Sequence, residues 1–180
     1  MGFELTELAI VFGCLLPGLH TAYTDIKKGI IYDAVTLLIF SAGLIFAIIA
    51  HSCINALIGS ALGFFSFFIA AWITNGSVGG GDIKLAAGIG MWFGYVQTIE
   101  ILVIACLASI FFEFIRYWRA GTFKKLFTDR LGPYAQKVLL RFGYRINNVD
   151  LAIDVKYASI PFAPFLVFSS WLVYLFHHLI

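Results

Sequence analysis

The chain has 180 residues, of which 61% are hydrophobic and only 12% are charged, and its net charge is +2. A soluble domain is about half apolar and about a quarter charged, and the mean hydropathy here is +0.94. This composition excludes an ordinary soluble domain and predicts a membrane protein. We expect no nucleic-acid partner.

Long apolar segments, each near the length that spans a bilayer, alternate with polar breaks. Six are predicted, at about 5–23, 30–50, 54–74, 83–95, 98–115 and 160–180. The expected fold class is therefore all-α, a polytopic membrane protein with about six transmembrane helices. Pro17 is expected to kink the first helix. Gly59 and Gly63 form a small-xxx-small pair that lets another helix approach closely.

The positive charges predict the orientation. With six spans and the N-terminus outside, the inner loops are about 24–29, 75–84 and 116–159, and all 12 lysines and arginines fall in them. Because Lys and Arg resist translocation, both termini are predicted to lie outside. The expected location is the inner (plasma) membrane, and the expected organisation is a single membrane-embedded domain over residues 1–180.

The basic cytoplasmic loop at about 116–159 shows a helical pattern. Apolar side chains recur at three- and four-residue steps among its basic residues: Phe127, Leu131, Tyr134, Val138 and Phe142. This pattern is typical of an amphipathic helix on an anionic inner leaflet. A solvated basic loop is the alternative, and a substrate-docking role is a third interpretation.

Asp82 follows three glycines and opens the fourth segment. A carboxylate near the hydrocarbon is costly, so it is a functional candidate by default. Glycines allow another chain segment to approach closely, and a loosened backbone at membrane depth is tolerated where it lines a wet cavity. The alternative is that Asp82 only caps a helix, with its oxygen accepting backbone N–H bonds.

Asp25 closes the first segment, where the negative end of the helix dipole disfavours a carboxylate. One interpretation is an interfacial charge that pairs with Lys27 and Lys28. The predicted topology, however, puts Asp25 and Asp82 at the same inner boundary, with the active site there. Two carboxylates brought close share one proton. One then acts as a base toward water while the other, protonated, polarises a carbonyl, which is peptide hydrolysis without a metal.

Asp33 is a competing acid near the start of the second segment. A negative charge suits the helix dipole at that position, so a capping or interfacial role is expected. Its contribution to the site stays open at this point.

Other kinds of site find no support in the sequence. The three cysteines, Cys14, Cys53 and Cys106, form no pair at metal-ligand spacing. The glycine cluster matches neither nucleotide-binding pattern. We therefore expect no metal and no cofactor.

Three motifs resemble those of one family. The run Gly79-Gly80-Gly81-Asp82-Ile83-Lys84-Leu85 resembles the G-x-G-D-x-K-L signature of type IV prepilin peptidases. Asp25 with Ile31 and Thr36 is similar to that family's D-x5-I-P-N-x-x-T segment. Pro161-Phe162-Ala163-Pro164 resembles its P-[FY]-[GA]-P motif. The matches follow the expected order over nearly the whole chain.

The resemblance implies that Asp25 and Asp82 are a catalytic pair. The supporting residues that it implies are Gly79, Gly81, Lys84, Pro161 and Pro164. It implies an intramembrane aspartic endopeptidase that uses aspartate-activated water. The implied substrates are prepilins or pseudopilins of type IV pilus assembly or protein secretion, whose short basic leader is removed at the cytoplasmic face. The implied partners are those leader peptides and a bilayer with an anionic inner leaflet.

The sequence departs from the family pattern at two places. Tyr32 and Asp33 stand where the family usually has Pro and Asn, and they are similar to the Tyr-Asp pair of presenilin-like proteases, whose Pro-Ala-Leu motif is absent. Nothing matches the cysteine-containing segment that larger bacterial members carry and that is associated with methyl transfer. The resemblance is therefore to a short form, and we expect a peptidase without methyltransferase activity.

A function of another class is the alternative: a non-catalytic membrane transporter or a pilus or secretion assembly component. Acids inside membranes often mark ion or proton paths. On that interpretation the acids should lie mid-span and face a pore. The boundary positions of Asp25 and Asp82 favour the peptidase.

Overall fold

The computed structural model describes residues 2–73, 78–119 and 161–179, all in helices or short connections with no strand in these ranges. The elements are α1 (Gly2–Ile10), the π-helical turn η1 (Val11–Leu15), α2 (Leu16–Lys28), α3 (Asp33–Ile49), α4 (Cys53–Ile73), α5 (Gly80–Arg119) and α8 (Ala163–Leu179). The all-α class is confirmed for this part of the chain. The pattern at 127–142 lies outside the described residues.

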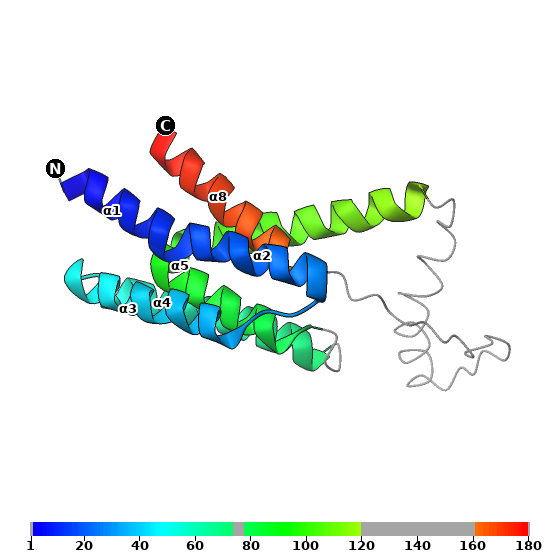
Figure 1. Ribbon diagram of the computed structural model, residues 1–180, viewed down its shortest axis with the longest axis horizontal. Helices are drawn as coiled ribbons and strands as arrows, with labels where there is room; N and C mark the ends of the chain where they lie inside the picture. The colour runs from blue at the N-terminus through cyan, green and yellow to red at the C-terminus, as the bar shows by residue number, and fades with distance from the viewer. Residues whose placement is uncertain (1, 74–77, 120–160, 180) are drawn as a thin grey trace, which may run out of the picture. The chain divides into compact units, whose positions relative to one another are not determined.

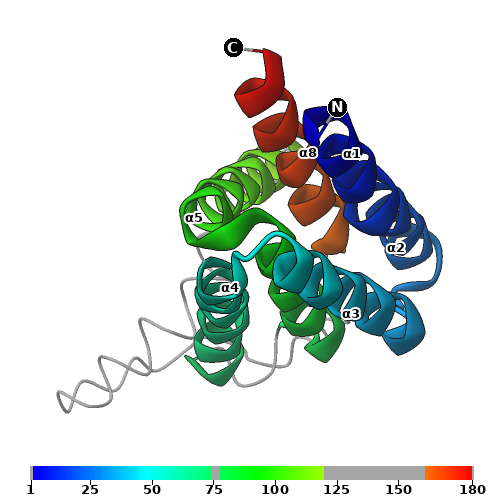
Figure 2. The ribbon, with the colours of Figure 1, turned by 90° about the vertical axis from the view of Figure 1, so that its left-hand side faces the viewer.

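Two compact units divide the chain, Met1–Ala108 with Ser159–Ile180 as the first and Ser109–Ala158 as the second. All the helices except the last turns of α5 belong to the first unit. Within it, α2 packs against α8, and α3 packs against α2, η1 and α4 (Figures 1 and 2). The single-domain organisation stays a prediction.

The helices have the character of membrane spans. Three are long and apolar enough to cross a membrane: Leu5–Lys28, Cys53–Ile73 and Gly80–Arg116. Two apolar helices are shorter, Asp33–Ile49 and Ala163–His177. Large apolar side chains lie exposed along them, and an apolar surface of this kind suits contact with lipid. The number of six spans and the outward termini stay predictions.

Helix α5 is broken at Gly94, one residue before the predicted end of the segment 83–95. Gly94 has φ 70° and ψ −177°, a conformation that is essentially restricted to glycine. The side chain of Asn55, from the start of α4, accepts a hydrogen bond from the Tyr95 N–H at 3.1 Å. The break thus begins a new helical segment whose first free N–H is capped by a neighbouring helix.

Replacing Asn55 by Ala should lower the free energy of unfolding by about 1 kcal/mol, because the Tyr95 N–H loses its acceptor. The change is measured by unfolding the purified protein in detergent while its helix content is monitored by circular dichroism. Asn55→Asp is the matched control, since it keeps an oxygen acceptor at the positive end of a helix. Equal stability of the Ala and Asp variants would contradict the capping role.

Helices α4 and α5 touch through their backbones. A β-carbon added at Gly59 would overlap the carbonyl of Gly90, and one added at Gly63 would overlap the carbonyl of Ala86. The predicted close approach at Gly59 and Gly63 is therefore confirmed. The contact fixes the part of α5 that carries Asp82 against α4.

Trp92 fixes the same part of α5 from the other side. Its indole N–H donates a hydrogen bond to the carbonyl of Ile39 in α3 at 2.8 Å, and its ring stacks on Phe46. The ring fills the space beside Gly13 and Gly43, where a β-carbon would collide with it. Helix α5 is thereby packed against both η1 and α3.

The first helix is disturbed just before Pro17. The turn Val11–Leu15 is π-helical, and Pro17 lies in the first turn of α2. Proline cannot donate to the carbonyl four residues before it, and π-helical turns accommodate such interruptions. The structure shows this local change in winding before Pro17, and a kink at Pro17 stays a prediction.

Candidate active site

Asp25 lies in the last turn of α2, buried at 9% exposure. The helix ends at Lys28 and is capped by Gly29, whose left-handed backbone (φ 63°) directs its N–H to the Asp25 carbonyl at 2.8 Å. The carboxylate of Asp25 accepts a hydrogen bond from the N–H of Ala163, the first residue of α8, at 3.2 Å. The charge that its own helix disfavours therefore lies at the positive end of α8.

The prolines around Ala163 explain why its N–H is available. Pro161 and Pro164 have no N–H to donate, and the N–H groups of Phe165 and Leu166 both bond to the Phe162 carbonyl. Ala163 itself is fully buried. The two motif prolines thus leave the Ala163 N–H as the donor that faces Asp25.

Lys27 and Lys28 do not pair with Asp25, so that interpretation is wrong. The ammonium of Lys27 donates to the Tyr23 hydroxyl and lies over its ring. The ammonium of Lys28 donates to the Tyr32 hydroxyl at 3.2 Å. Both lysines contact exposed tyrosines. The buried carboxylate of Asp25 instead accepts its hydrogen bond from the start of α8.

Asp82 is the third residue of α5. Its N–H bonds to the Gly79 carbonyl at 3.1 Å. One carboxylate oxygen, Oδ2, lies beside Gly79, where a β-carbon would stand 3.2 Å from it, as for an acid that reaches back over the start of its helix. The capping interpretation fits this oxygen. The other, Oδ1, is buried, and no residue in the described part of the chain donates to it. The charges of Asp82 and Asp25 lie close enough to interact.

The glycines before Asp82 differ in how much space surrounds them. A β-carbon at Gly79 would lie 3.2 Å from Oδ2 of Asp82, and one at Gly81 would lie 2.7 Å from Cβ of Ile31. A β-carbon at Gly80 would meet nothing within 4 Å. The outer two glycines therefore leave room for the carboxylate and for Ile31, whereas the middle position tolerates a side chain.

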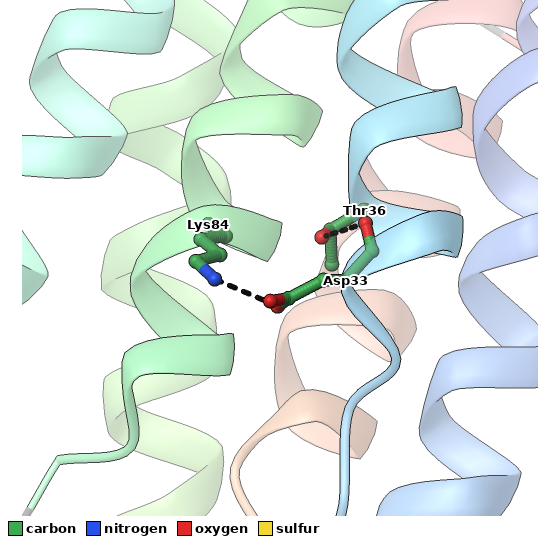
Figure 3. Close-up of polar contacts among 3 residues, drawn as sticks. All are labelled: Asp33, Thr36 and Lys84. Atoms are coloured by element: carbon green, nitrogen blue, oxygen red, sulfur yellow. Dashed lines mark hydrogen bonds and ion pairs between the residues drawn. The ribbon is translucent and has the colours of Figure 1, made fainter.

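Asp33 lies apart from the hydrogen bonds of the two aspartates. It is the first residue of α3, and its carboxylate forms an ion pair with Lys84 of α5 at 2.7 Å (Figure 3). The hydroxyl of Thr36 bonds to the Asp33 carbonyl one turn on, at 3.0 Å. Lys84, which lies two residues after Asp82 and was expected to be a supporting residue, thus contacts Asp33.

Two parts of the site were missed by the sequence reasoning. The Ala163 N–H had a signal, because prolines three residues apart at a helix start remove donors on either side of it. Two other contacts, of Ile31 with Gly81 and of Asp33 with Lys84, had no signal in the sequence. Each joins residues far apart in the chain, and the separation is 51 for Asp33 and Lys84.

The chemistry available at the site is that of two interacting carboxylates, one held by a backbone N–H and one with a buried free oxygen. Such a pair suits general acid–base catalysis. Among the described residues, no group of three or more His, Cys, Asp and Glu side chains is placed to hold a metal ion. The absence of a cofactor stays a prediction.

The described residues form apolar helices with two acids at neighbouring helix ends, and fold and site together define a helical protein of membrane character. The chain belongs to the type IV leader peptidase family, whose family model matches residues 9–114. That range includes Asp25 and Asp82.

Two relatives are each named "Prepilin leader peptidase/N-methyltransferase". One, from Burkholderia pseudomallei (strain 1026b), is 26% identical over 123 residues, which cover 60% of this chain and 37% of that protein. The other, from Xanthomonas campestris pv. campestris, is 24% identical over 173 residues, which cover 92% of this chain and 48% of that protein. The chain thus spans less than half the length of these curated relatives. No solved structure matches the chain.

Proposed function

We propose that this chain is a membrane aspartic endopeptidase that removes the leader from prepilins or pseudopilins. The observation that supports it most is the pairing of Asp25 and Asp82, whose charges interact. Asp82 also keeps a buried oxygen to which no described residue donates. An unsatisfied buried carboxylate oxygen is costly, and a substrate or a water at this point would satisfy it.

The proposed mechanism divides the roles of acid and base between the two aspartates. The carboxylate of Asp25 accepts the Ala163 N–H, whereas Oδ1 of Asp82 is buried with no donor among the described residues, so Asp25 is assigned as the base that takes a proton from water. Asp82 carries the shared proton and donates a hydrogen bond from its carboxyl to the scissile carbonyl. Water then attacks that carbonyl, and the proton taken up by Asp25 passes to the leaving amine. The peptide bond breaks without a covalent enzyme intermediate.

The proposed setting is the inner (plasma) membrane, crossed about six times, with the aspartates at the cytoplasmic boundary. The bonds from Asp25 to α8 and from Lys84 to α3 join four helix ends on one side, near Lys27 and Lys28 of α2. Basic residues on one side favour the cytoplasm and an anionic inner leaflet. We extend to this chain only the peptidase part of the relatives' name, because the two carboxylates suit hydrolysis.

The test is a cleavage assay in membranes. The full chain is co-expressed with a C-terminally tagged prepilin from the same genome, and membranes without the chain serve as the control. Leader removal should appear as a gel shift, and mass spectrometry of the product should place the new N-terminus just before the hydrophobic segment. Hydroxylamine added during cleavage should form no hydroxamate, because no acyl-enzyme exists to trap.

Failure to cut any prepilin-like protein of that genome would overturn the proposal and favour a non-catalytic membrane component. Cleavage accompanied by a trapped hydroxamate would keep the peptidase and overturn the direct attack of water.

A further inference from the structure

We propose that Asp33 is a positioning residue of this peptidase, which holds the first turn of α5 through its ion pair with Lys84 and so orients Asp82. The inference rests on the proposed function. Asp33 does not touch the reacting atoms in this scheme. It acts through Lys84, its ion-pair partner (Figure 3), which lies two residues after Asp82 near the start of α5.

The first turn of α5 has little of its own to fix it. Three consecutive glycines lead into Asp82, and glycine loses more conformational freedom on ordering than any other residue. Gly80 has no neighbour where a β-carbon would stand. Oδ1 of the Asp82 carboxylate is buried and has no donor among the described residues. The direction of that carboxylate therefore depends on where the backbone of this turn is placed.

Two contacts from a single segment place that turn. Gly81 lies against Ile31, so closely that a β-carbon there would collide with it. Lys84 bonds to Asp33, two residues after Ile31. The contacts thus fall on both sides of Asp82, one residue before it and two residues after it. Ile31 supplies a steric stop and Asp33 supplies an attraction.

The charges suit this arrangement. Asp33 lies at the positive end of α3, where its carboxylate is stabilised. Lys84 lies at the positive end of α5, where an ammonium is disfavoured unless an acid accompanies it. Residues two apart on a helix do not face each other, so the pair draws Lys84 away from Asp82. Loss of the Asp33 carboxylate would leave the Lys84 ammonium without this partner, near Asp82.

The exposure of the Asp33–Lys84 ion pair to solvent allows a positioning role to be distinguished from a purely structural one. The side chains are 73% exposed for Asp33 and 52% for Lys84. Exposed ion pairs contribute little to global stability. A small displacement of a catalytic group, in contrast, costs up to about a hundredfold in rate. Loss of the pair should therefore reduce turnover without lowering the unfolding midpoint.

The kinetic test uses the purified full chain and the tagged prepilin. Asp33→Asn and Lys84→Met should each lower kcat about tenfold, with KM changed less than about twofold. The double variant should be no slower than either single one, because one interaction is lost. Asp33→Glu and Lys84→Arg keep the charges and should retain most of the activity. Glu100→Gln is the matched control, since it breaks the ion pair of α5 with His177 and should leave kcat unchanged.

A spectroscopic test reads the turn itself and needs no activity. A nitroxide is attached to Gly80→Cys, where a side chain has open space. Cys53 and Cys106 are replaced by Ser, and Cys14 is buried. Asp33→Asn should sharpen the electron paramagnetic resonance spectrum of this label, because the turn gains mobility, whereas Glu100→Gln should not.

The two tests keep the proposals apart. An unchanged kcat in Asp33→Asn, or a double variant slowed by the product of both single effects, would overturn the positioning role. An unchanged spectrum would overturn it as well. If the wild-type chain cuts no prepilin but the spectrum sharpens in Asp33→Asn, the ion pair orders the turn and only the proposed function fails.

Discussion

Asp82→Asn and Asp25→Asn should each lower kcat for leader removal by about a thousandfold or more. Asparagine keeps the shape of aspartate but neither takes up nor delivers a proton, and general acid–base catalysis contributes about 10²- to 10⁴-fold per group. Single-turnover cleavage of the tagged prepilin by each purified variant measures the loss. The amide at position 25 still offers an oxygen to the Ala163 N–H, so the helix contact should persist.

The double variant Asp25→Asn with Asp82→Asn should be no slower than either single variant. The two carboxylates act as one unit, and removing either member stops the same proton transfers. Independent effects that multiply would contradict a shared mechanism.

Substitutions of other acidic residues serve as controls, and the expected loss of kcat differs among them. Asp33→Asn should lose about tenfold, far less than the aspartate pair, and Glu100→Gln should lose nothing. Asp82→Asn should unfold no more readily than wild type, since it puts a neutral side chain of the same shape in place of a carboxyl whose Oδ1 is buried with no donor among the described residues. If Asp33→Asn or Asp82→Asn is inactive while Asp25→Asn cuts normally, the enzyme stands and the assignment of Asp25 is wrong.

The helices could be predicted from the sequence because their signal is local. Hydropathy over about 20 residues marks a span, and the segment predicted at 54–74 is the observed Cys53–Ile73. A break in α5 falls at Gly94, one residue before the predicted end of the segment 83–95, where backbone geometry available to glycine ends one helical stretch and begins another.

The candidate site could be predicted only in part. The aspartates stand out because a carboxylate near hydrocarbon is expensive. Their partners do not, because the Ala163 N–H that serves Asp25 lies 138 residues away in sequence. The sequence suggested Lys27 and Lys28 as partners of Asp25, because they are its near neighbours in the chain. That interpretation was wrong. Contacts between distant segments depend on packing, which no local pattern reports.

Gly59→Ala should lower the free energy of unfolding by about 2 kcal/mol, because its methyl group would push against the backbone of α5. A β-carbon at Gly59 would overlap the Gly90 carbonyl and would lie 2.7 Å from the Gly94 oxygen. Backbone atoms cannot move aside as a flexible side chain can, so the two helices must separate. Unfolding of the detergent-solubilised protein by titration with sodium dodecyl sulfate measures the effect.

Gly80→Ala is the matched control for this prediction. It makes the same substitution on α5 where nothing lies within 4 Å, and there alanine should leave stability unchanged or raise it by up to about 1 kcal/mol. Gly90→Ala should repeat the loss seen in Gly59→Ala, since its β-carbon would overlap the Gly59 carbonyl. The two substitutions together should cost less than their sum, because one separation of the helices relieves both overlaps. Equal stability of Gly59→Ala and Gly80→Ala would contradict the backbone contact that fixes the first half of α5, and with it the placement of Asp82.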